Sequence, residues 1–409
     1  MHARLTDANA LGFAEYYLRQ KAENANLANH AIAGFLEHIR GRLRYDPTVI
    51  PIIIWDGRAQ WRYDLLPTYK SGRHRTPEQR ADRAAYEPQR LHIRHALRFF
   101  PVIQILHPGA EADDVAYGLS HQLAAQGHLV DLHTSDTDWM QTVGPRVRWV
   151  NARKAAQVIE LEGFARATGF ATPALYAQGK ALAGDDTDDI IGVPGVAMGR
   201  ASALIAKYGD VAGVLHAAED VFTFSQEPKY YRHLMLPEVR EQVRKNLPLV
   251  DLSLAPPLKG ADIQVEVGAF EELELAEFFA SHGMAGYLAD NEWPKWLRAL
   301  SNPLSRSDVL SNITELQKRI NSAQKEISAT TFEGKAANGL VKVQTDGNGQ
   351  VKRVTFDEGL KGEDLETLAD LVVVAMNDAN TQKEAFAKSK LAGMATGLLP
   401  LGMSIPGLG

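Results

Sequence analysis

Apolar and polar positions alternate in blocks along the first 150 residues, and the blocks predict a parallel sheet. Four short runs rich in β-branched residues are predicted as strands, at residues 49–55 (VIPIIIW), 102–106, 128–133 and 146–150. Runs that are apolar at every position are typical of strands buried on both faces. Stretches predicted as helices lie between them, at residues 28–44, 77–99 and 113–126. This alternation predicts an α/β domain with a mostly parallel sheet.

From about residue 154 the pattern becomes helical, with helices expected at 154–167, 173–183 and 199–208. The sequence Gly192-Val193-Pro194-Gly195-Val196 predicts a tight turn that opens the last of these helices. Glycines permit close approach of two backbones, and a helix N-terminus offers unpaired N–H groups to a phosphate. This turn is therefore a candidate contact for a nucleic-acid backbone.

The last hundred residues form a separate module. Residues 301–307 (SNPLSRS) predict a linker, and residues 308–330 carry apolar positions at helical spacing. Residues 340–344 and 351–356 alternate around Asp346-Gly347-Asn348-Gly349, which predicts a hairpin, and residues 365–391 predict a long helix. The tail, 392–409, is expected to be flexible. The chain therefore divides into 1–153, 154–300, the linker 301–307, and 308–409.

Composition narrows the class of protein. The 409 residues are 45% apolar with a formal net charge of −6, and cysteine is absent. Disulfides, zinc–thiolate sites and cysteine nucleophiles are therefore excluded. The first twenty residues lack the apolar core of a signal peptide, and no run approaches the roughly 20 apolar residues of a membrane helix. We expect a soluble, cytoplasmic protein with no membrane partner.

Acidic residues recur where the apolar runs end. Carboxylates gathered at one edge repel each other, and a hard cation such as Mg²⁺ or Mn²⁺, which prefers oxygen ligands, offsets the repulsion. Two such ions about 4 Å apart can clamp the attacking and leaving oxygens of a phosphodiester. Helix capping, Asx turns and a solvated acidic loop are the alternatives. The acidic positions are Asp7, Asp56, Glu111, Asp113, Asp114, Asp136, Asp138 and the segment Asp185–Asp189.

Basic residues are concentrated in one segment. Residues 58–98 contain ten Lys or Arg and four Asp or Glu, a local excess of six positive charges in an acidic protein. A basic segment of this kind suits a polyanion held beside metal ions. A solvated, arginine-rich helix face is the equally weighted alternative.

Residues 1 to about 254 resemble the 5′ nuclease family, in particular bacteriophage 5′→3′ exonucleases and flap endonucleases. The resemblance is carried by TDANALGF (6–13), IIIWDG (52–57), WRYDLLPTYKSGR (61–73), EADD (111–114), TSDTDW (134–139), GDDTDDIIGVPGV (184–196) and KNLPLVDL (245–252). It implies a PIN-like α/β nuclease core at 1–153 and a helical, helix-hairpin-helix-type DNA-binding subdomain within 154–300.

The resemblance also implies roles for individual residues. Two Mg²⁺ or Mn²⁺ ions would be held by Asp7, Asp56, Glu111, Asp113 and Asp114, and by Asp136, Asp138, Asp185 and Asp188. Lys70 and Arg73 would act with Asp113 and Asp114 in catalysis. DNA contacts would come from Arg62, Tyr69, Lys70, Arg73, Arg75, Gly192, Gly195, Val196, Gly199 and Arg200, with K⁺ as a candidate ion at the turn. Tyr69 would either stack on an unpaired base or pack in the core.

One departure from the family pattern lies in the turn. The family places glycine, a hydrophobic residue and glycine before a small residue and Lys or Arg. In this chain Gly195-Val196 is followed by Ala197, and the basic residue Arg200 is shifted by one position.

Residues from about 307 to 409 resemble the YbaB/EbfC nucleoid-associated family. The matching stretches are GKAANGLVKVQTDGNGQVKRVTFD (334–357) and LADLVVVAMNDANTQKEAFAKSKLAGM (368–394). The resemblance implies an α+β module that forms dimers and binds DNA with little sequence preference. Residues 306–409 contain 12 Lys or Arg and 13 Asp or Glu, so their charge favours dimerisation over a strong electrostatic grip on DNA.

These observations lead to one main hypothesis for function. The chain is expected to be a two-metal, structure-specific 5′ nuclease that acts on 5′ ends, flaps or duplex ends of DNA. Its C-terminal module would make it a nucleoid-associated homodimer, and phage replication or repair in a bacterial host is the expected setting. Two alternatives remain open, a non-catalytic architectural DNA-binding dimer and a PIN-type ribonuclease.

Overall fold

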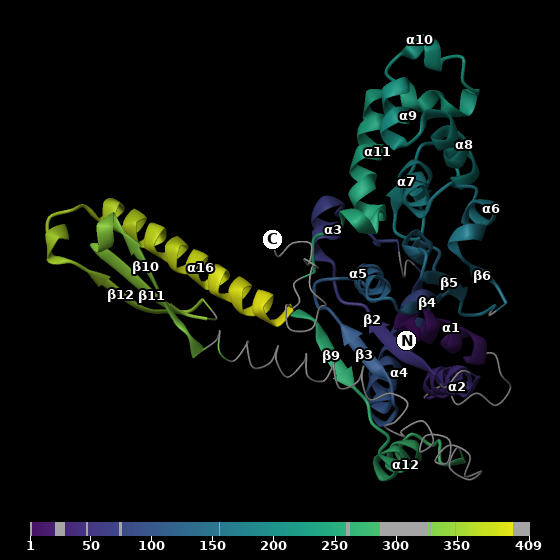
Figure 1. Cartoon of the computed structure of the whole chain (residues 1–409), viewed down its shortest axis with the longest axis horizontal. Coiled ribbons are helices and arrows are strands. Elements are labelled where there is room, and N and C mark those ends of the chain that lie inside the picture. The colour runs from purple at the N-terminus through teal and green to yellow at the C-terminus, as the bar shows by residue number, and fades with distance from the viewer. Residues whose placement is uncertain are drawn as a thin grey trace. The chain divides into compact units, whose positions relative to one another are not determined.

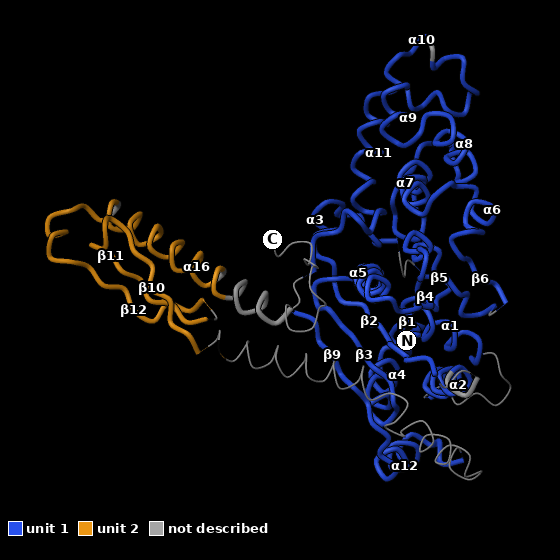
Figure 2. The backbone as a smooth tube through the Cα atoms, in the orientation of Figure 1, with its two compact units in different colours: residues 1–306 blue, residues 307–409 orange. Residues whose placement is uncertain are grey.

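The computed structural model describes residues 2–20, 29–45, 48–72, 76–154, 156–258, 262–286, 326, 329–347 and 349–395. These residues belong to two compact units, Met1–Arg306 and Ser307–Gly409, which Figure 2 distinguishes by colour. Unit 1 contains a seven-stranded sheet with its helices, and unit 2 contains a three-stranded sheet with one long helix (Figure 1).

The sheet of unit 1 has the strand order β6-β5-β4-β1-β2-β3-β9. Its five inner strands run parallel. They are β5 (Val147–Asn151), β4 (Leu129–Thr134), β1 (His2–Asp7), β2 (Val49–Trp55) and β3 (Ile103–Leu106). The edge strands β6 (Val158–Ile159) and β9 (Gln264–Val267) are antiparallel to their neighbours. Because β4, β1 and β2 are adjacent and parallel, the residues that follow them emerge at the same edge of the sheet.

Helices bury the inner strands and explain their apolar sequences. β2 is buried at all seven positions. A core cluster joins residues of β2 to residues of the helices and includes Phe35, Trp55, Tyr86 and Phe279, each at most 1% exposed. The helices that contribute to it are α1 (Ala8–Gln20), α2 (His30–Tyr45), α4 (Pro77–Ala96) and α12 (Glu272–Ser281). On the chain between β3 and β4 lies α5 (Ala112–Ala125), which contacts β1, β2 and β4.

Local sequence signals set where these helices begin. The side chain of Thr76 accepts a hydrogen bond from the backbone N–H of Gln79, and the Gln79 side chain accepts one from the backbone N–H of Thr76. Pro77 takes the first helical position of α4. This reciprocal capping satisfies donors that a helix start leaves unpaired. A short helix, α3 (Gln60–Leu65), precedes α4. Among the described helices, none combines the length and apolarity needed to cross a bilayer.

The second part of unit 1 is helical. Figure 1 shows its helices gathered at one end of the unit. They are α6 (Phe164–Thr168), α7 (Pro173–Ala183), α8 (Met198–Tyr208), α9 (Val211–Ala217), α10 (Val221–Phe224) and α11 (Pro237–Val250). A short ladder, β7 (Gly184–Asp185) with β8 (Ile190–Ile191), joins α7 to α8. Asn246 of α11 donates to the carbonyl oxygens of Ala181 and Ile191 at 3.0 and 2.8 Å, which ties α11 to both ends of this ladder.

The structure differs from the sequence expectations at several places in unit 1. The pattern did not predict β1, because four of its six positions are polar. His2 and Arg4 form ion pairs with Asp131 of β4 at 3.0 and 3.3 Å, so these polar residues pair across the sheet. The helix predicted at 154–167 is wrong. Strand β6 and a 3-10 turn (Leu161–Gly163) occupy its first half, and only α6 is helical.

Unit 2 is a meander covered by a helix. Strands β10 (Thr331–Ala336), β11 (Val341–Asp346) and β12 (Val351–Phe356) form an antiparallel sheet in that order. The long helix α16 (Leu365–Ala395) packs on β10 and β11 around Val341, Val343 and Ala375. The predicted hairpin and long helix are present, and β10 was not predicted. The expected linker, nearly all of the helix expected at 308–330, and the tail from 396 lie outside the described residues.

Gly334 of β10 lets α16 approach the sheet. A Cβ atom at this position would lie 1.9 Å from the carbonyl oxygen of Ala375 and 2.4 Å from the amide nitrogen of Ala379. Gly334→Val is therefore expected to destabilise unit 2 by about 1–3 kcal/mol or more, because backbone cannot yield as a side chain can. Hydrogen exchange of the amides in β10, β11 and α16 measures the effect. The matched variant Thr331→Val, at an exposed position of the same strand, should retain native protection; equal protection in Gly334→Val would contradict the expected clash.

His133 of β4 predicts a pH dependence of stability. Its side chain is 1% exposed. Burial and then the positive charges of His38, Arg42 and Arg4 lower its pKa well below 6.5, although Asp131 opposes them. His133 therefore binds a proton near pH 6.5 in the unfolded chain but stays neutral at that pH in the folded chain. The free energy of unfolding consequently falls as the pH drops below about 6.5.

The unfolding free energy of His133→Leu should depend less on pH than that of the wild type. Between pH 6.5 and the lowered pKa of His133, the two slopes should differ by up to about 1.4 kcal/mol per pH unit. Urea unfolding between pH 5 and 8 measures the difference between the two profiles. His121→Leu, at an exposed position of α5, serves as the matched control. Parallel profiles for His133→Leu and the wild type would show that His133 does not carry the dependence.

Candidate metal centre

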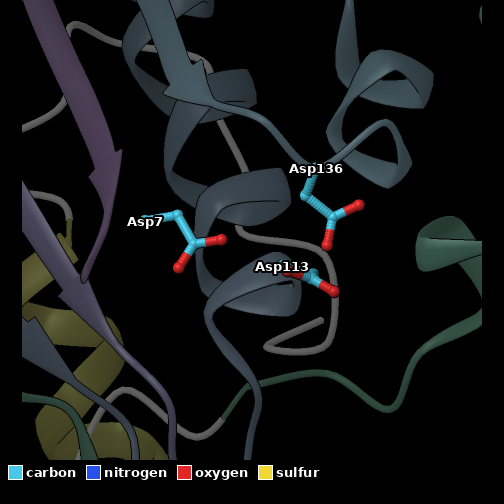
Figure 3. Close-up of side chains that lie close together, drawn as sticks. All are labelled: Asp7, Asp113 and Asp136. Carbon is cyan, nitrogen blue, oxygen red and sulfur yellow. The ribbon is translucent and has the colours of Figure 1, made fainter. Parts of the chain in front are cut away.

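Three aspartates meet at the carboxyl edge of the central strands. Asp7 ends β1, Asp136 follows β4 by two residues, and Asp113 lies in the first turn of α5. One carboxylate oxygen from each lies within 4.8 Å of the others. Figure 3 shows the three side chains around a common space. Three of the nine carboxylates expected as ligands are thus brought together by the parallel pairing of β4 with β1 and by the start of α5.

The cluster disfavours its own negative charge. Burial, followed by repulsion from Asp56 and Asp136, raises the pKa of Asp7 to about 7. Two donors partly offset this, since Ala10 N–H lies 2.9 Å from Oδ1 of Asp7 and the Thr134 hydroxyl donates to Oδ2 at 3.2 Å. Burial and the charge of Asp136 also raise the pKa of Asp113 well above its ordinary value. A bound cation would reverse these shifts, because it favours the ionised form of each carboxyl.

Indole and backbone donors fix the two remaining members of the cluster. Trp139 Nε1 donates to Oδ1 of Asp113 at 2.6 Å. The loop that carries Asp136 is held by Trp149 Nε1, which donates to the Asp136 carbonyl at 2.8 Å. Both tryptophan side chains are buried. The apolar core beneath the sheet edge therefore sets the positions of the carboxylates.

Asp56 and Glu111 border the cluster. Asp56 accepts hydrogen bonds from Asn9 Nδ2 at 2.6 Å and from the Ala112 N–H at 2.8 Å. Its charge contributes to the raised pKa of both Asp7 and Asp113, so the three carboxyls share one electrostatic environment. Burial of Glu111 opposes ionisation, yet the charges of Lys70 and Arg62 lower its pKa below the ordinary value.

A second acidic group surrounds Lys180 of α7. The Lys180 ammonium donates to Asp138 Oδ1, and to Asp185 Oδ2 at 2.9 Å. Lys180 is 6% exposed, so its charge is taken up by these two carboxylates. Burial raises the pKa of Asp185, but Lys180 and Thr187 outweigh it and hold that pKa below the ordinary value. The structure thus brings Asp138 and Asp185 together, with an internal lysine as counter-charge.

Asp114 is not one of the three clustered aspartates and binds Arg62. The Arg62 guanidinium donates to the two carboxylate oxygens of Asp114 at 2.7 and 2.6 Å, and to Glu111 Oε2 at 3.2 Å. Burial opposes the charge of Arg62, but Asp114 raises its pKa above the ordinary value. Arg62 is 2% exposed, and its guanidinium compensates the charge of buried carboxylates. The expected contact of Arg62 with DNA stays a prediction.

Tyr69 is packed in the protein. Its ring is 3% exposed, and its hydroxyl lies 2.8 Å from Glu111 Oε2 and 2.9 Å from Asp188 Oδ2. An unpaired base cannot stack on this ring in the present conformation, so the structure favours the packed alternative over base stacking. Asp188 is thereby placed next to Glu111, although one lies in the β7–β8 turn and the other at the start of α5.

The Lys70 side chain lies between the same two acids, Glu111 and Asp188. Its ammonium donates to Glu111 Oε1 and lies 3.7 Å from Asp188 Oδ2. Its backbone N–H donates to the Asp188 carbonyl at 3.0 Å, and its φ of 55° is in the left-handed region. This conformation costs a lysine roughly 1 kcal/mol, which the surrounding contacts offset. Arg73 and Arg75, also expected to contact DNA, lie outside the described residues.

The predicted turn before α8 is present. Gly195 has a φ of 80°, and the N–H of the buried Val196 donates to the Val193 carbonyl at 2.9 Å. An added Cβ at Gly192 would lie 2.2 Å from the carbonyl group of Ala183, so glycine is required there. The turn leaves the N-terminus of α8 without a side-chain cap at Ala197. The position of Gly199, in the first turn of α8, is open around its Cα.

Arg200 lies against this turn. Its guanidinium donates to the Gly195 carbonyl and lies 4.1 Å from the centre of the Tyr230 ring. The residue is exposed, so its charge adjoins the uncapped N-terminus of α8. The one-position shift noted in the sequence therefore still leaves a cation beside the turn.

Sequence reasoning missed three residues of the site, namely Lys180, Trp139 and Thr134. A lysine within PALYAQGKALA, five positions before Asp185, is the signal that could have identified Lys180. Trp139 follows Asp138 directly, but its bond to Asp113 joins segments 26 positions apart. A contact between residues so far apart in the sequence cannot be predicted from the spacing of residues within a motif.

The residues present fit hard divalent cations. The Asp7, Asp113 and Asp136 donors are carboxylate oxygens, the ligands that Mg²⁺ and Mn²⁺ prefer. Asp7 and Asp113 are more basic than isolated aspartates because burial and mutual repulsion raise their pKa values. A proton shared between two carboxyl groups would satisfy a pair, but here each of the three carboxylates lies close to two others. The site therefore fits a bound metal ion better than a hydrogen-bonded carboxyl pair.

Comparison with known proteins gives two separate matches. Residues 2–169 match the family described as 5′-3′ exonuclease, N-terminal resolvase-like domain. DNA polymerase I of Mycobacterium tuberculosis (strain H37Rv) is 29% identical over 225 residues, which cover 53% of this chain and 24% of the polymerase. DNA polymerase I of Rhizobium leguminosarum is 29% identical over 237 residues, or 54% of this chain and 22% of that protein. The chain thus spans about a quarter of the length of these relatives.

A solved structure supports the fold. The T5 5′-exonuclease with bound zinc ions superimposes with a TM-score of 0.52 at 22% identity, covering 70% of this chain and all of the other. Together with the strand order, this likeness shows a PIN-like 5′ nuclease fold with a mostly parallel sheet.

The C-terminal region has its own relatives. Residues 304–398 match the YbaB/EbfC DNA-binding family. The nucleoid-associated protein Atu0095 of Agrobacterium fabrum is 38% identical over 100 residues, which cover 24% of this chain and 94% of that protein. The chain therefore belongs to the YbaB/EbfC DNA-binding family through this region, which follows a region matching the N-terminal resolvase-like domain of 5′-3′ exonucleases.

Proposed function

We propose that this protein hydrolyses DNA phosphodiester bonds at or near 5′ ends in a reaction that depends on divalent metal ions. The observation that carries the proposal is the Asp7, Asp113 and Asp136 cluster at the carboxyl edge of a 5′ nuclease fold, with one oxygen of each within 4.8 Å of the others. Ligands of open parallel sheets bind beyond the carboxyl ends of the strands, where these residues lie.

Two carboxylate groups would hold the ions, which we propose to be Mg²⁺ or Mn²⁺. The first consists of Asp7, Asp56, Glu111 and Asp113, with Asp114 acting through Arg62 and the start of α5. The second consists of Asp136, Asp138, Asp185 and Asp188. Such ions, when bound, polarise the phosphodiester and lower the pKa of a bound water. The carboxylates are held by Trp139, Thr134 and Ala10, so little rearrangement is needed for binding.

Cationic side chains would hold the scissile phosphate. Lys70 lies beside Glu111 and Asp188, and a metal ion bound to these acids would free its ammonium to contact a phosphate oxygen. Such a contact stabilises negative charge that develops in the transition state. We assign the same role to Arg73, four residues after Tyr69, and a DNA-backbone contact to Arg75. A water molecule, and no side chain, would be the nucleophile, leaving a 5′ phosphate.

The turn before α8 would bind the duplex backbone. The uncapped N-terminus of α8, the exposed Arg200 and the glycines at 192, 195 and 199 present N–H groups and one cation on the same segment. Helix N-termini of this kind bind phosphates. K⁺ is a candidate ion at the carbonyls of this turn.

The C-terminal module would form a homodimer and add DNA affinity. Val351, Val354 and Phe356 of β12 are 43%, 37% and 48% exposed, and β12 is the edge strand of its sheet. An apolar edge strand is suited to pairing with another chain. Two nuclease regions joined in this way would raise each other's effective concentration on DNA. A nucleoid-associated, cytoplasmic location would follow.

The proposal is tested with a 5′-flapped duplex, a blunt duplex and a single-stranded RNA, each labelled at either end. Products released from 5′ ends with Mg²⁺ and absent with EDTA would support a 5′ nuclease, and product lengths would separate flap cutting from stepwise digestion. Cleavage restricted to the RNA would favour a PIN-type ribonuclease. Binding without cleavage by folded protein would favour the architectural dimer. Light scattering of the full chain reports its oligomeric state.

A further inference from the structure

Two histidines from distant parts of the sequence meet on the surface of unit 1. His92 lies on the exposed face of α4, and His282 caps the C-terminal end of α12. The Nδ1 atom of His92 and the Nε2 atom of His282 are 3.0 Å apart, and the two rings lie edge to face with centroids 4.3 Å apart. Because only residues 97–102 separate α4 from the start of β3, this pair lies toward the amino end of the sheet, opposite the acidic cluster.

The hydrogen bonds of His282 leave Nε2 as the metal-binding atom. Its Nδ1 lies 2.8 Å from the carbonyl oxygen of Phe278, which can only accept a hydrogen bond. Nδ1 therefore carries the hydrogen, and Nε2 of the neutral ring accepts a hydrogen bond from Nδ1 of His92. A metal ion bound by both nitrogens would take the place of that hydrogen. Metal-binding histidines commonly donate their second N–H to a backbone carbonyl in this way, which fixes the tautomer and the ring orientation.

The position of His282 is also fixed by packing. Its ring stacks on Phe278 with centroids 4.1 Å apart, and Phe278 is buried. The side chain of the buried Asn29 donates to the His282 carbonyl at 2.5 Å. The ring stack and the hydrogen bond from Nδ1 hold the imidazole before any ion binds, and Asn29 holds the backbone of His282. This lowers the entropy lost on binding.

The separation of the two nitrogens suits one transition-metal ion. Metal–nitrogen bonds to histidine are about 2.0–2.1 Å long, so nitrogens 3.0 Å apart subtend roughly 90–95° at a shared ion. That angle is close to the one between neighbouring ligands in octahedral and square-planar complexes. Imidazole ligands favour Zn²⁺, Cu²⁺ and Ni²⁺ over Mg²⁺ and Ca²⁺.

A third imidazole lies one helical turn away. His95 follows His92 by three residues, so both side chains lie on the same face of α4. Burial and then the positive charges of His282 and His95 lower the pKa of His92. The neutral form, the one that binds metals, is therefore favoured. The His95 ring is 6.0 Å from the Phe278 ring, and the Phe278 ring also stacks on the ring of His282.

We propose that His92 and His282 bind one imidazole-preferring transition-metal ion, of the Zn²⁺, Cu²⁺ or Ni²⁺ class. The ion links α4 to α12, two helices separated by about 190 residues of chain. This site differs from the acidic cluster in its ligands, its metal preference and its place on the sheet.

Selective ¹⁵N labelling of the 13 histidines in the untagged full chain tests the site, with Zn²⁺ as the probe. Zn²⁺ bound to carboxylates elsewhere leaves imidazole signals unchanged, so the spectrum reads histidine ligands directly. Zn²⁺ is expected to shift the ring signals of His92 and His282 together. In His92→Gln the His282 signal should need at least about tenfold more Zn²⁺ to shift, and the reverse should hold in His282→Gln.

His121→Gln, at an exposed position of α5, is the matched control and should bind Zn²⁺ as the wild type does. Shifts of the His282 ring that are equal in the wild type and in His92→Gln would overturn the proposal, because they would show single-histidine binding. Absence of any His282 shift at stoichiometric Zn²⁺ would overturn it as well. Far-UV circular dichroism of each variant verifies folding, and the exposed position of His92 makes its replacement compatible with the fold.

Discussion

Asp113→Asn is expected to lose roughly two or more orders of magnitude of DNA-cleaving turnover while its affinity for DNA persists. The amide keeps the oxygen that accepts from Trp139 Nε1 but carries no charge for a cation. The same change removes a carboxylate that burial and Asp136 already destabilise. In metal-free buffer the variant should therefore be at least as stable as the wild type. Single-turnover cleavage, DNA binding and thermal unfolding in EDTA measure the three quantities.

Asp186→Asn provides the matched control for this prediction. Asp186 lies in the acidic segment between β7 and β8, but it is exposed and outside the expected ligand set. Its replacement should change turnover less than about threefold, since a solvated charge at a distance is screened. Wild-type turnover in a folded Asp113→Asn protein would refute the metal assignment. Loss of stability in EDTA would instead show that Asp113 is needed for the fold.

Arg62→Leu is expected to lower the free energy of unfolding by about 3–5 kcal/mol, because it leaves buried carboxylates uncompensated. Arg62 is 2% exposed and binds Asp114 through two hydrogen bonds of 2.7 and 2.6 Å. Removal of one partner of a buried ion pair costs more than removal of both. Urea unfolding in EDTA measures the loss, with buffer near pH 7.5 to keep the acids ionised.

Two further variants make the test specific. Arg62→Leu/Asp114→Leu should recover a large part of the loss, since the uncompensated charge is then gone. Arg58→Leu removes an exposed arginine four residues earlier on the same segment and should cost less than about 1 kcal/mol. If the double variant were as unstable as the sum of the single ones, the two residues would act independently and the ion pair would not be the cause.

The sequence predicted the edge of the sheet that carries the acids, and the reason is local. Runs such as VIPIIIW are apolar at every position, and in a parallel sheet that pattern marks both a buried strand and the place where it ends. Asp136 could therefore be placed near the other strand ends before any coordinates were known. β1 was not predicted because residues such as His2 and Arg4 are polar, and their partner Asp131 lies more than 120 residues away in the sequence.

The roles of charged and aromatic side chains were harder to predict. Arg62 and Tyr69 stand in the basic segment, and both were expected to contact DNA. Charge and residue type are visible in a sequence, but burial is decided by which segments fold over them. Here Arg62 and Tyr69 are buried because they bind Asp114 and Glu111, some 40 to 50 residues later in the sequence. The role of Lys180 was missed for the same reason, because one of its carboxylate partners, Asp138, lies 42 residues away in the sequence.

Strand β9 has a practical consequence for anyone who shortens this protein. The chain leaves the sheet after β6, forms the helical region, and returns at residues 264–267 to pair with β3. A protein cut after residue 169 or 254, where sequence similarity suggests a boundary, would lose β9 and also Phe278, Phe279 and Met284 from the core. It would expose an apolar strand edge that invites aggregation. Soluble expression of the nuclease region alone should therefore require the chain at least through Met284, the last of these core residues.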